Sequence, residues 1–210
     1  MPARLAVVKL IRMDNVRLGI IGMGNIGRYH ADYLRNGKVK RCELVAVCDA
    51  VAPLDHYKPL KIFTDGEALI KSGAVDAVLI ATPHFQHTTL GIAALEAGVH
   101  AMVEKPISSH KADAERLIAV AQQHPRTVFG GMFQMRTEPR YQKVRKLITG
   151  GDLGQIVRLN WINTDWYRTE AYFVSGGWRA TWKGEGGRVL LNQCLHNLDT
   201  LQWLAGMPRR

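Results

Sequence analysis

The sequence predicts an α/β protein whose first part is a doubly wound parallel sheet, followed by a region of different character. Three observations carry this prediction. Short apolar runs alternate with helix-like segments over residues 16–134. The first apolar run ends in a glycine-rich turn, where a sheet of this kind receives a ligand. After residue 134 the alternation is lost. We therefore divide the chain into a leader (1–15), a first domain (16–134) and a second region (135–210).

The first strand and helix frame a G-x-G-x-x-G motif at Gly22, Gly24 and Gly27, between a strand at 18–21 and a helix expected over 25–34. Gly22 permits a tight turn, Gly24 lets a pyrophosphate approach the backbone, and Gly27 allows close packing of helix on strand. The phosphates would bind N–H groups at the start of the helix. The alternative is a glycine turn in some other α/β domain.

The second strand supports a dinucleotide site of the Rossmann type. It is expected over 43–48 and ends in Asp49, 22 residues after Gly27, where an acid binds the adenosine ribose hydroxyls. A 2′-phosphate would be repelled by this carboxylate. We therefore expect NAD as the cofactor rather than NADP.

The following elements continue the alternation as far as residue 131. Residues 50–60 hold two prolines, so we expect one turn there in place of a full crossover helix. We then expect a helix over 64–71, a strand over 75–81, a helix over 87–97, a strand over 100–103, a helix from 108 or 109 to 124, and a strand over 127–131. Strands alternating with helices in this way form a parallel sheet covered on both faces.

The second region has fewer regular signals. We expect a helix over 139–148 that ends at Gly150 and Gly151, a half-exposed strand over 155–166, and a helix over 189–204. Residues 166–187 are rich in Trp, Tyr, Arg and Gly without a period, and long irregular segments are often functional.

Composition narrows the class of protein. The formal net charge is +10, but the basic residues are dispersed and no recognition motif is present, so we expect no nucleic-acid partner. No apolar run is long enough to cross a membrane, and residues 1–15 lack a secretory cleavage site. The three cysteines are scattered, which favours reduced thiols and a cytoplasmic location. We expect no metal site.

Several motifs together resemble the Gfo/Idh/MocA oxidoreductases over most of the chain, from Val16 to Pro208. Beyond the glycine motif, they are Ala81-Thr82-Pro83 with His87, Glu104-Lys105-Pro106, the turn at 148–154 with its following strand, and H-x-x-D at His196 and Asp199. The resemblance implies a Rossmann domain, a C-terminal α/β domain on a mostly antiparallel sheet, and NAD or NADP. It also implies oxidation of a hydroxyl on a sugar, inositol or related polyol.

Two departures from the family pattern matter. Many relatives carry Asp four residues before the helix histidine, where this chain has Asn192. The family's second domain also needs strands that would follow Arg210, so the C-terminal α/β domain is expected to be incomplete. We therefore expect weak NAD binding, little turnover and self-association of this chain, and a homo-oligomer in the full-length form.

The expected chemistry is hydride transfer, in which Lys105 polarises the reacting oxygen and His196 accepts the proton. Asn192 shares the helix face of His196 at i, i+4 and would hydrogen-bond a substrate hydroxyl. Asp199 either supports the imidazole or is an ordinary acid on the helix surface. Lys105 as a surface lysine and His196 as a structural histidine are the competing interpretations.

Two sets of residues are assigned to ligands. Each set has an alternative interpretation. Instead of binding substrate, the aromatic residues and the arginine could pack the second domain or a subunit contact, namely Trp166, Tyr172, Trp178 and Arg179. Instead of lining the cofactor, His87 could simply be the first residue of a helix. The cofactor set is Gly22, Met23, Gly24, Asn25, Ile26, Gly27, Asp49, Thr82, Pro83, His87, Glu104, Lys105 and Gln134, with Arg136 nearby. The substrate set is Lys105, Trp166, Tyr172, Trp178, Arg179, Asn192 and His196.

A rival from another class is a non-catalytic dinucleotide-binding module, such as a sensor or a regulatory partner. Such a module has no need for both Lys105 and His196. The presence of the pair therefore favours an enzyme.

Overall fold

The structure is a computed structural model that describes residues 15–164, 167–174, 177–179, 181–187 and 189–207. Its contacts divide the chain into two compact units, Met1–Gly131 and Met132–Arg210. Each unit is described here by itself.

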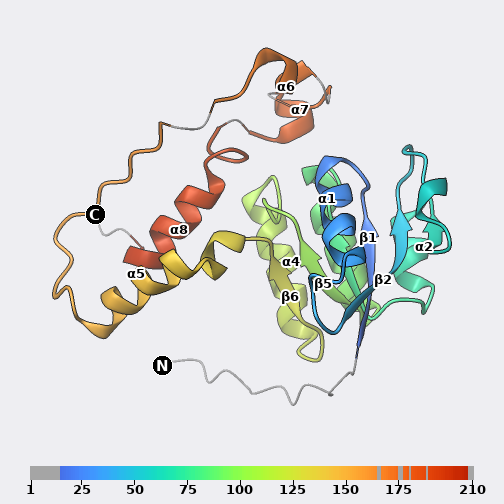
Figure 1. Ribbon diagram of the computed structural model, residues 1–210, viewed down its shortest axis with the longest axis horizontal. Coiled ribbons are helices and arrows are strands. Elements are labelled where there is room, and N and C mark those ends of the chain that lie inside the picture. Colours follow the sequence, from blue (N-terminus) through green and yellow to red (C-terminus); the bar gives the residue numbers. More distant parts are fainter. Residues whose placement is uncertain (1–14, 165–166, 175–176, 180, 188, 208–210) are drawn as a thin grey trace. The chain divides into compact units, whose positions relative to one another are not determined.

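The first unit is built on one parallel sheet of six strands in the order β3-β2-β1-β4-β5-β6 (Figure 1). The strand order reverses between β1 and β4, and the carboxyl ends of parallel strands beside such a reversal form a ligand crevice. The prediction of a doubly wound sheet is confirmed. The strands are β1 (Val16–Ile21), β2 (Cys42–Cys48), β3 (Lys61–Phe63), β4 (Ala77–Ile80), β5 (His100–Val103) and β6 (Phe129–Gly131).

Helices cover both faces of this sheet. A Cβ on Gly27 of α1 would lie 3.6 Å from Ile20, whereas Leu69 of α2 would contact a Cβ on Gly19. Successive residues of a strand point to opposite faces, so α1 and α2 lie on opposite sides of β1. The helices of this unit are α1 (Asn25–Arg35), α2 (Gly66–Lys71), α3 (His87–Glu96) and α4 (Lys111–Gln123), with short 3-10 turns η1 (Asp55–Tyr57) and η2 (His84–Gln86).

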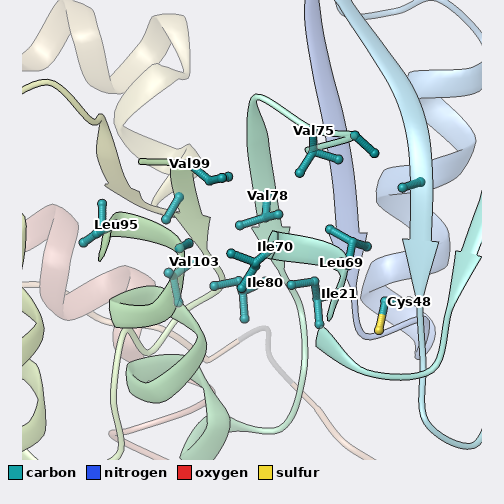
Figure 2. Close-up of a cluster of buried hydrophobic side chains, with 14 of the residues drawn as sticks. Ile21, Cys48, Leu69, Ile70, Val75, Val78, Ile80, Leu95, Val99 and Val103 are labelled. Atoms are coloured by element: carbon teal, nitrogen blue, oxygen red, sulfur yellow. The ribbon is translucent and has the colours of Figure 1, made fainter. Parts of the chain in front are cut away.

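The main hydrophobic core lies between the sheet and the layer formed by α2, α3 and α4 (Figure 2). Val78 and Ile80 of β4 are fully buried there against Leu69, Leu95 and Leu117. Burying an aliphatic side chain of this size contributes about 1.5–3 kcal/mol relative to its exposure. Every residue of the cluster belongs to the first unit, which therefore has a core of its own.

Strand β3 was not predicted. It has only three residues, and it pairs at the sheet edge with the end of β2, where Cys48 is aligned with Phe63. A strand this short has no measurable alternation, so only its partner identifies it. The expected single turn before it is η1, and α4 begins at Lys111, slightly later than expected.

The described part of the second unit contains helices without strands. They are η3 (Gln134–Thr137), α5 (Pro139–Gly150), α6 (Glu170–Val174), α7 (Trp182–Glu185) and α8 (Leu195–Ala205). Helix α5 ends, as predicted, at glycines, with Gly151 in the left-handed conformation. It packs on α8, where the Arg145 guanidinium donates to the carbonyls of Trp203 and Leu204.

Two expectations for this unit are wrong. Residues 155–164 form neither strand nor helix, and Val157 is 93% exposed. Their alternation suits one face of a sheet, but a strand forms only with a neighbour to share its hydrogen bonds, and the described residues supply none. The last helix begins at Leu195 instead of residue 189, because residues 189–194 form a turn in which Cys194 N–H bonds to Val189 O.

Across the described residues, no helix is long and apolar enough to span a membrane. Cys42, Cys48 and Cys194 all carry free thiols. Burial, followed by the charges of Asp65 and Asp49, raises the pKa of Cys48 to about 12, so this thiol stays protonated at neutral pH.

Candidate functional site

The glycine turn between β1 and α1 has the shape of a phosphate cradle. Gly22 has a φ of +95°, and a Cβ there would lie 2.7 Å from the backbone of Ala81, directly after β4. A Cβ on Gly27 would lie 1.9 Å from Gly22 O, so only glycine allows α1 this close to the strand. Gly24 is the N-cap of α1, and nothing lies within 4 Å of the Cβ position there. A pyrophosphate fits this opening, at the positive end of a helix.

Asp49 follows β2 directly and lies beside the same glycine turn. Its Oδ2 accepts the N–H of Met23 at 2.7 Å, and its Oδ1 accepts the N–H groups of Val51 and Ala52 at 2.9 and 2.8 Å. Burial alone would raise the pKa of Asp49, but these three hydrogen bonds and the charge of Arg28 outweigh it and lower the pKa. The side chain is therefore a carboxylate at neutral pH. It is held beside the glycine turn and can accept hydrogen bonds from hydroxyl groups.

The exit of β4 carries Thr82 and Pro83. Pro83 is exposed, and Thr82 is half-buried with its carbonyl turned to His87. The Thr82 Oγ1 is buried and, among the described residues, has no hydrogen-bond partner. This edge of the sheet thus holds an unsatisfied hydroxyl beside an accessible proline ring.

His87, expected on the nicotinamide side, is only 1% exposed. Its Nδ1 lies 2.7 Å from Pro106 O and its Nε2 lies 2.8 Å from Thr82 O. Burial lowers the pKa of His87, although its hydrogen bonds to the Pro106 and Thr82 carbonyls oppose that shift. The ring therefore lies between the exits of β4 and β5, with each nitrogen facing a backbone carbonyl, and the neutral ring can donate to one of the two.

Glu104 is also turned inward. It is 7% exposed, its Oε1 lies 2.7 Å from His30 Nε2, and its Oε2 accepts the N–H of Lys105 at 3.1 Å. His30 Nδ1 in turn lies 2.7 Å from the hydroxyl of Tyr33. His30 was not among the expected site residues. Its position in the sequence could have identified it, because His30 lies three residues beyond the glycine motif and on the same buried face of α1 as Gly27 and Leu34.

Lys105 follows directly at the carboxyl end of β5. It is half-buried, and its peptide bond to Pro106 is cis. β5 pairs with β4, and β4 pairs with β1, so Lys105 leaves the sheet at the same edge as the glycine turn. The structure thus brings Lys105 to the edge of the sheet at which Gly22 and Asp49 lie.

In the second unit, His196 lies in the first turn of α8. It is half-buried, with Phe133 packed edge-on at 6.1 Å between ring centroids. Asp199, one turn further, forms a two-pronged ion pair with Arg136 at 2.8 and 2.5 Å. Asp199 therefore ties α8 to η3, where Gln134 is exposed to solvent.

Asn192 precedes α8 in the turn, so it does not share a helix face with His196 as expected. It is 7% exposed, and its Nδ2 donates to Glu185 Oε1, at the end of α7. Glu185 is 3% exposed. No sequence signal pointed to Glu185, because it lies in the irregular segment, where neither spacing nor periodicity marks a residue.

Three of the expected substrate residues lie together. The guanidinium of Arg179 stacks over the rings of Tyr172 and Trp178, at 4.7 and 4.9 Å from their centroids. Gln193 donates to the Tyr172 hydroxyl at 3.0 Å. Burial opposes the shift, but hydrogen bonds from Gln193 and Arg179 outweigh it and lower the pKa of Tyr172. Trp166 lies outside the described residues.

Comparison with known proteins covers both units. Residues 16–132 match an oxidoreductase family with an NAD-binding Rossmann fold, and residues 141–210 match the Gfo/Idh/MocA C-terminal domain. The inositol 2-dehydrogenase of Corynebacterium glutamicum is 27% identical over 197 residues, covering 91% of this chain and 55% of that protein. The chain spans about half the length of the curated relatives it matches.

Solved structures agree. The WlbA dehydrogenase of Chromobacterium violaceum, in complex with NADH and UDP-GlcNAcA, has a TM-score of 0.83 and 27% identity, over 93% of this chain and 57% of that one. The scyllo-inositol dehydrogenase of Lactobacillus casei, with NAD(H) and scyllo-inositol, has a TM-score of 0.76 and 25% identity, over 91% and 56%. The chain therefore belongs to the Gfo/Idh/MocA family of oxidoreductases and carries its NAD-binding domain.

Proposed function

We propose that this protein is an NAD-dependent dehydrogenase that oxidises a hydroxyl on a sugar- or inositol-like substrate. The observation that carries the proposal is the place of Lys105, at the carboxyl end of β5 on the edge of the sheet that holds the glycine turn and Asp49. A module that only binds a dinucleotide needs the turn and the acid, but no lysine at this strand exit.

The roles of the residues follow from their chemistry. Bound NAD supplies a ring that accepts a hydride from the substrate carbon. The Lys105 ammonium hydrogen-bonds the reacting oxygen and stabilises its alkoxide character, and the His196 imidazole takes the hydroxyl proton. Two electrons leave the carbon with the hydride, and the C–O bond becomes a carbonyl. Asn192 cannot accept this proton, so it is left with a binding role.

The remaining assignments divide between the two ends of the cofactor. The pyrophosphate and the ribose are held by Asp49 and by the glycine motif with Met23, Asn25 and Ile26. The nicotinamide side is contacted by Thr82, Pro83 and Gln134. Tyr172, Trp178, Arg179 and Trp166 contact the substrate, because stacked aromatic faces and an arginine fork suit a polyhydroxylated or acidic ring. Inositol is named for several relatives and a UDP-linked sugar acid for others, so both classes belong in the test.

The test is a coenzyme-reduction assay on the whole protein, with a panel of inositols, free sugars and nucleotide-linked sugars. Lys105→Ala and His196→Ala should each lower kcat roughly 100-fold or more, the scale of lost acid–base help. Lys111→Ala is the matched control, because its ammonium is exposed on α4. The affinity for NAD should be the same in His196→Ala as in the wild type, since this side chain is assigned to the substrate.

A whole protein that binds NAD but reduces it with no member of the panel would favour a non-catalytic binding module. Near-normal turnover by His196→Ala would remove His196 from the proposed role, and near-normal turnover by Lys105→Ala would remove the observation on which the proposal depends.

A further inference from the structure

The residue before Lys105 is a buried carboxylate with a defined set of donors. Glu104 Oε2 accepts the N–H of Lys105, and Glu104 Oε1 is bonded to His30 Nε2. The side chains of His30 and Glu104 are 5% and 9% exposed. A carboxylate this far from water must keep its donors or find others, because an unsatisfied buried charge is costly.

The hydrogen positions around His30 can be assigned from its neighbours. Burial, and then the charge of Glu104, raises the pKa of Tyr33, so its phenol keeps its proton at neutral pH. A carboxylate only accepts, so His30 Nε2 carries the proton of the contact with Glu104, and the Tyr33 hydroxyl lies on His30 Nδ1. The chain of hydrogen bonds runs from α1 to the Lys105 backbone.

We propose that His30 is a positioning residue, which keeps the Glu104 carboxylate occupied so that it does not draw the Lys105 ammonium away from the reacting oxygen. The proposal rests on the proposed role of Lys105. Loss of His30 leaves Glu104 Oε1 without this donor, and the adjacent residue, Lys105, carries an ammonium. His30 lies in α1, so the helix that receives the pyrophosphate also sets the surroundings of Lys105.

The test compares His30→Leu, which removes both hydrogen bonds at similar volume, with His30→Gln, whose amide has both a donor and an acceptor. His100→Gln is the matched control, because His100 lies at the opposite end of β5 and bonds to Val128 N. Circular dichroism checks the fold of each variant. Glu104→Gln/His30→Leu is the double variant, in which no carboxylate remains to attract the ammonium.

The first readout needs no turnover. Lys105 is acylated with an amine-reactive reagent at fixed pH, and its labelling rate is followed by mass spectrometry. We expect labelling of His30→Leu to slow about 10-fold, because a neighbouring carboxylate raises a lysine pKa by about one or more. His30→Gln and the double variant should label near the wild-type rate, and NAD affinity by calorimetry should change by less than about threefold in all variants.

The second readout is kcat on the active substrate, expected to fall between about 10-fold and 100-fold in His30→Leu, the cost of a misplaced group. A folded His30→Leu with normal Lys105 labelling overturns the proposal, and so does a loss of NAD affinity as large as the loss of labelling. If His30→Leu does not fold, His30→Ala takes its place: slower labelling of Lys105 in His30→Ala than in Glu104→Gln/His30→Ala supports the proposal, and equal rates overturn it. If labelling behaves as expected but no substrate is turned over, the proposed function fails while the effect of His30 on Lys105 stands.

Discussion

Replacement of Gly27 by alanine tests the physical reason for the dinucleotide turn. The added Cβ would lie 1.9 Å from Gly22 O and 3.0 Å from Gly22 C, and ordinary contact begins at 3.4 Å. Both obstructing atoms are backbone, so no side chain can rotate out of the way. Helix α1 must therefore move away from the turn by about 1.5 Å, the difference between 1.9 Å to Gly22 O and ordinary contact at 3.4 Å.

The expected cost has two parts of opposite sign. Overpacking of a tight site costs about 1–3 kcal/mol and more when backbone must move, while alanine in place of glycine in a helix gains up to about 1 kcal/mol. We expect a net loss of about 2 kcal/mol or more in the free energy of unfolding. For a chain of this length that lowers the Tm by roughly 4–8 °C.

Gly24→Ala is the matched variant in the same motif. Its backbone has φ −69°, which alanine adopts easily, and nothing lies within 4 Å of the new Cβ. We expect the Tm to change little while NAD affinity falls at least about 10-fold, because the methyl group occupies the space where the pyrophosphate approaches. The assays are thermal unfolding by circular dichroism and titration with NAD by calorimetry.

The two variants can contradict the argument independently. Gly27→Ala with wild-type Tm and NAD affinity would show that α1 moves at no cost, so close packing is not the role of Gly27. Gly24→Ala with unchanged NAD affinity would show that the pyrophosphate does not approach at Gly24.

The remaining predictions concern charge. Asn192→Asp should lower the free energy of unfolding by about 2 kcal/mol or more, because the new carboxylate meets the buried Glu185 carboxylate; equal stability of Asn192→Asp and Glu185→Gln/Asn192→Asp in urea would refute this. NAD(H) should bind at least about 10-fold tighter than NADP(H), because Asp49 repels a 2′-phosphate, and Asp49→Ala should narrow that ratio in paired calorimetric titrations. The hydrogen bond from Arg17 lowers the pKa of Asp76. The ionised Asp76 therefore adds to the free energy of unfolding above its unfolded pKa of about 3.9, and this contribution is lost as the pH falls through the lower folded pKa. In Asp76→Asn the free energy of unfolding should fall less steeply with acid than in the wild type, and an unchanged dependence on pH would contradict this.

The sequence alone predicted the framework of the first unit. Gly27 is required by the backbone of Gly22 in the same turn, Gly22 by its positive φ and by the backbone that follows β4, and Gly24 by no protein atom. Buried strands such as β4 are continuous apolar runs, and their pattern is visible without knowledge of a partner. The motif, the position of Asp49 and the exit of Lys105 from β5 followed from these local signals.

Only the tertiary structure decided which side chains meet. His30 and Glu104 are 74 residues apart, and Asp199 bonds to Arg136, 63 residues away. Strand β3 exists because β2 offers its edge, whereas residues 155–164 alternate but find no neighbour among the described residues. Local periodicity determines which face of a segment is apolar, but a strand or an ion pair requires a second segment, and its identity depends on the fold.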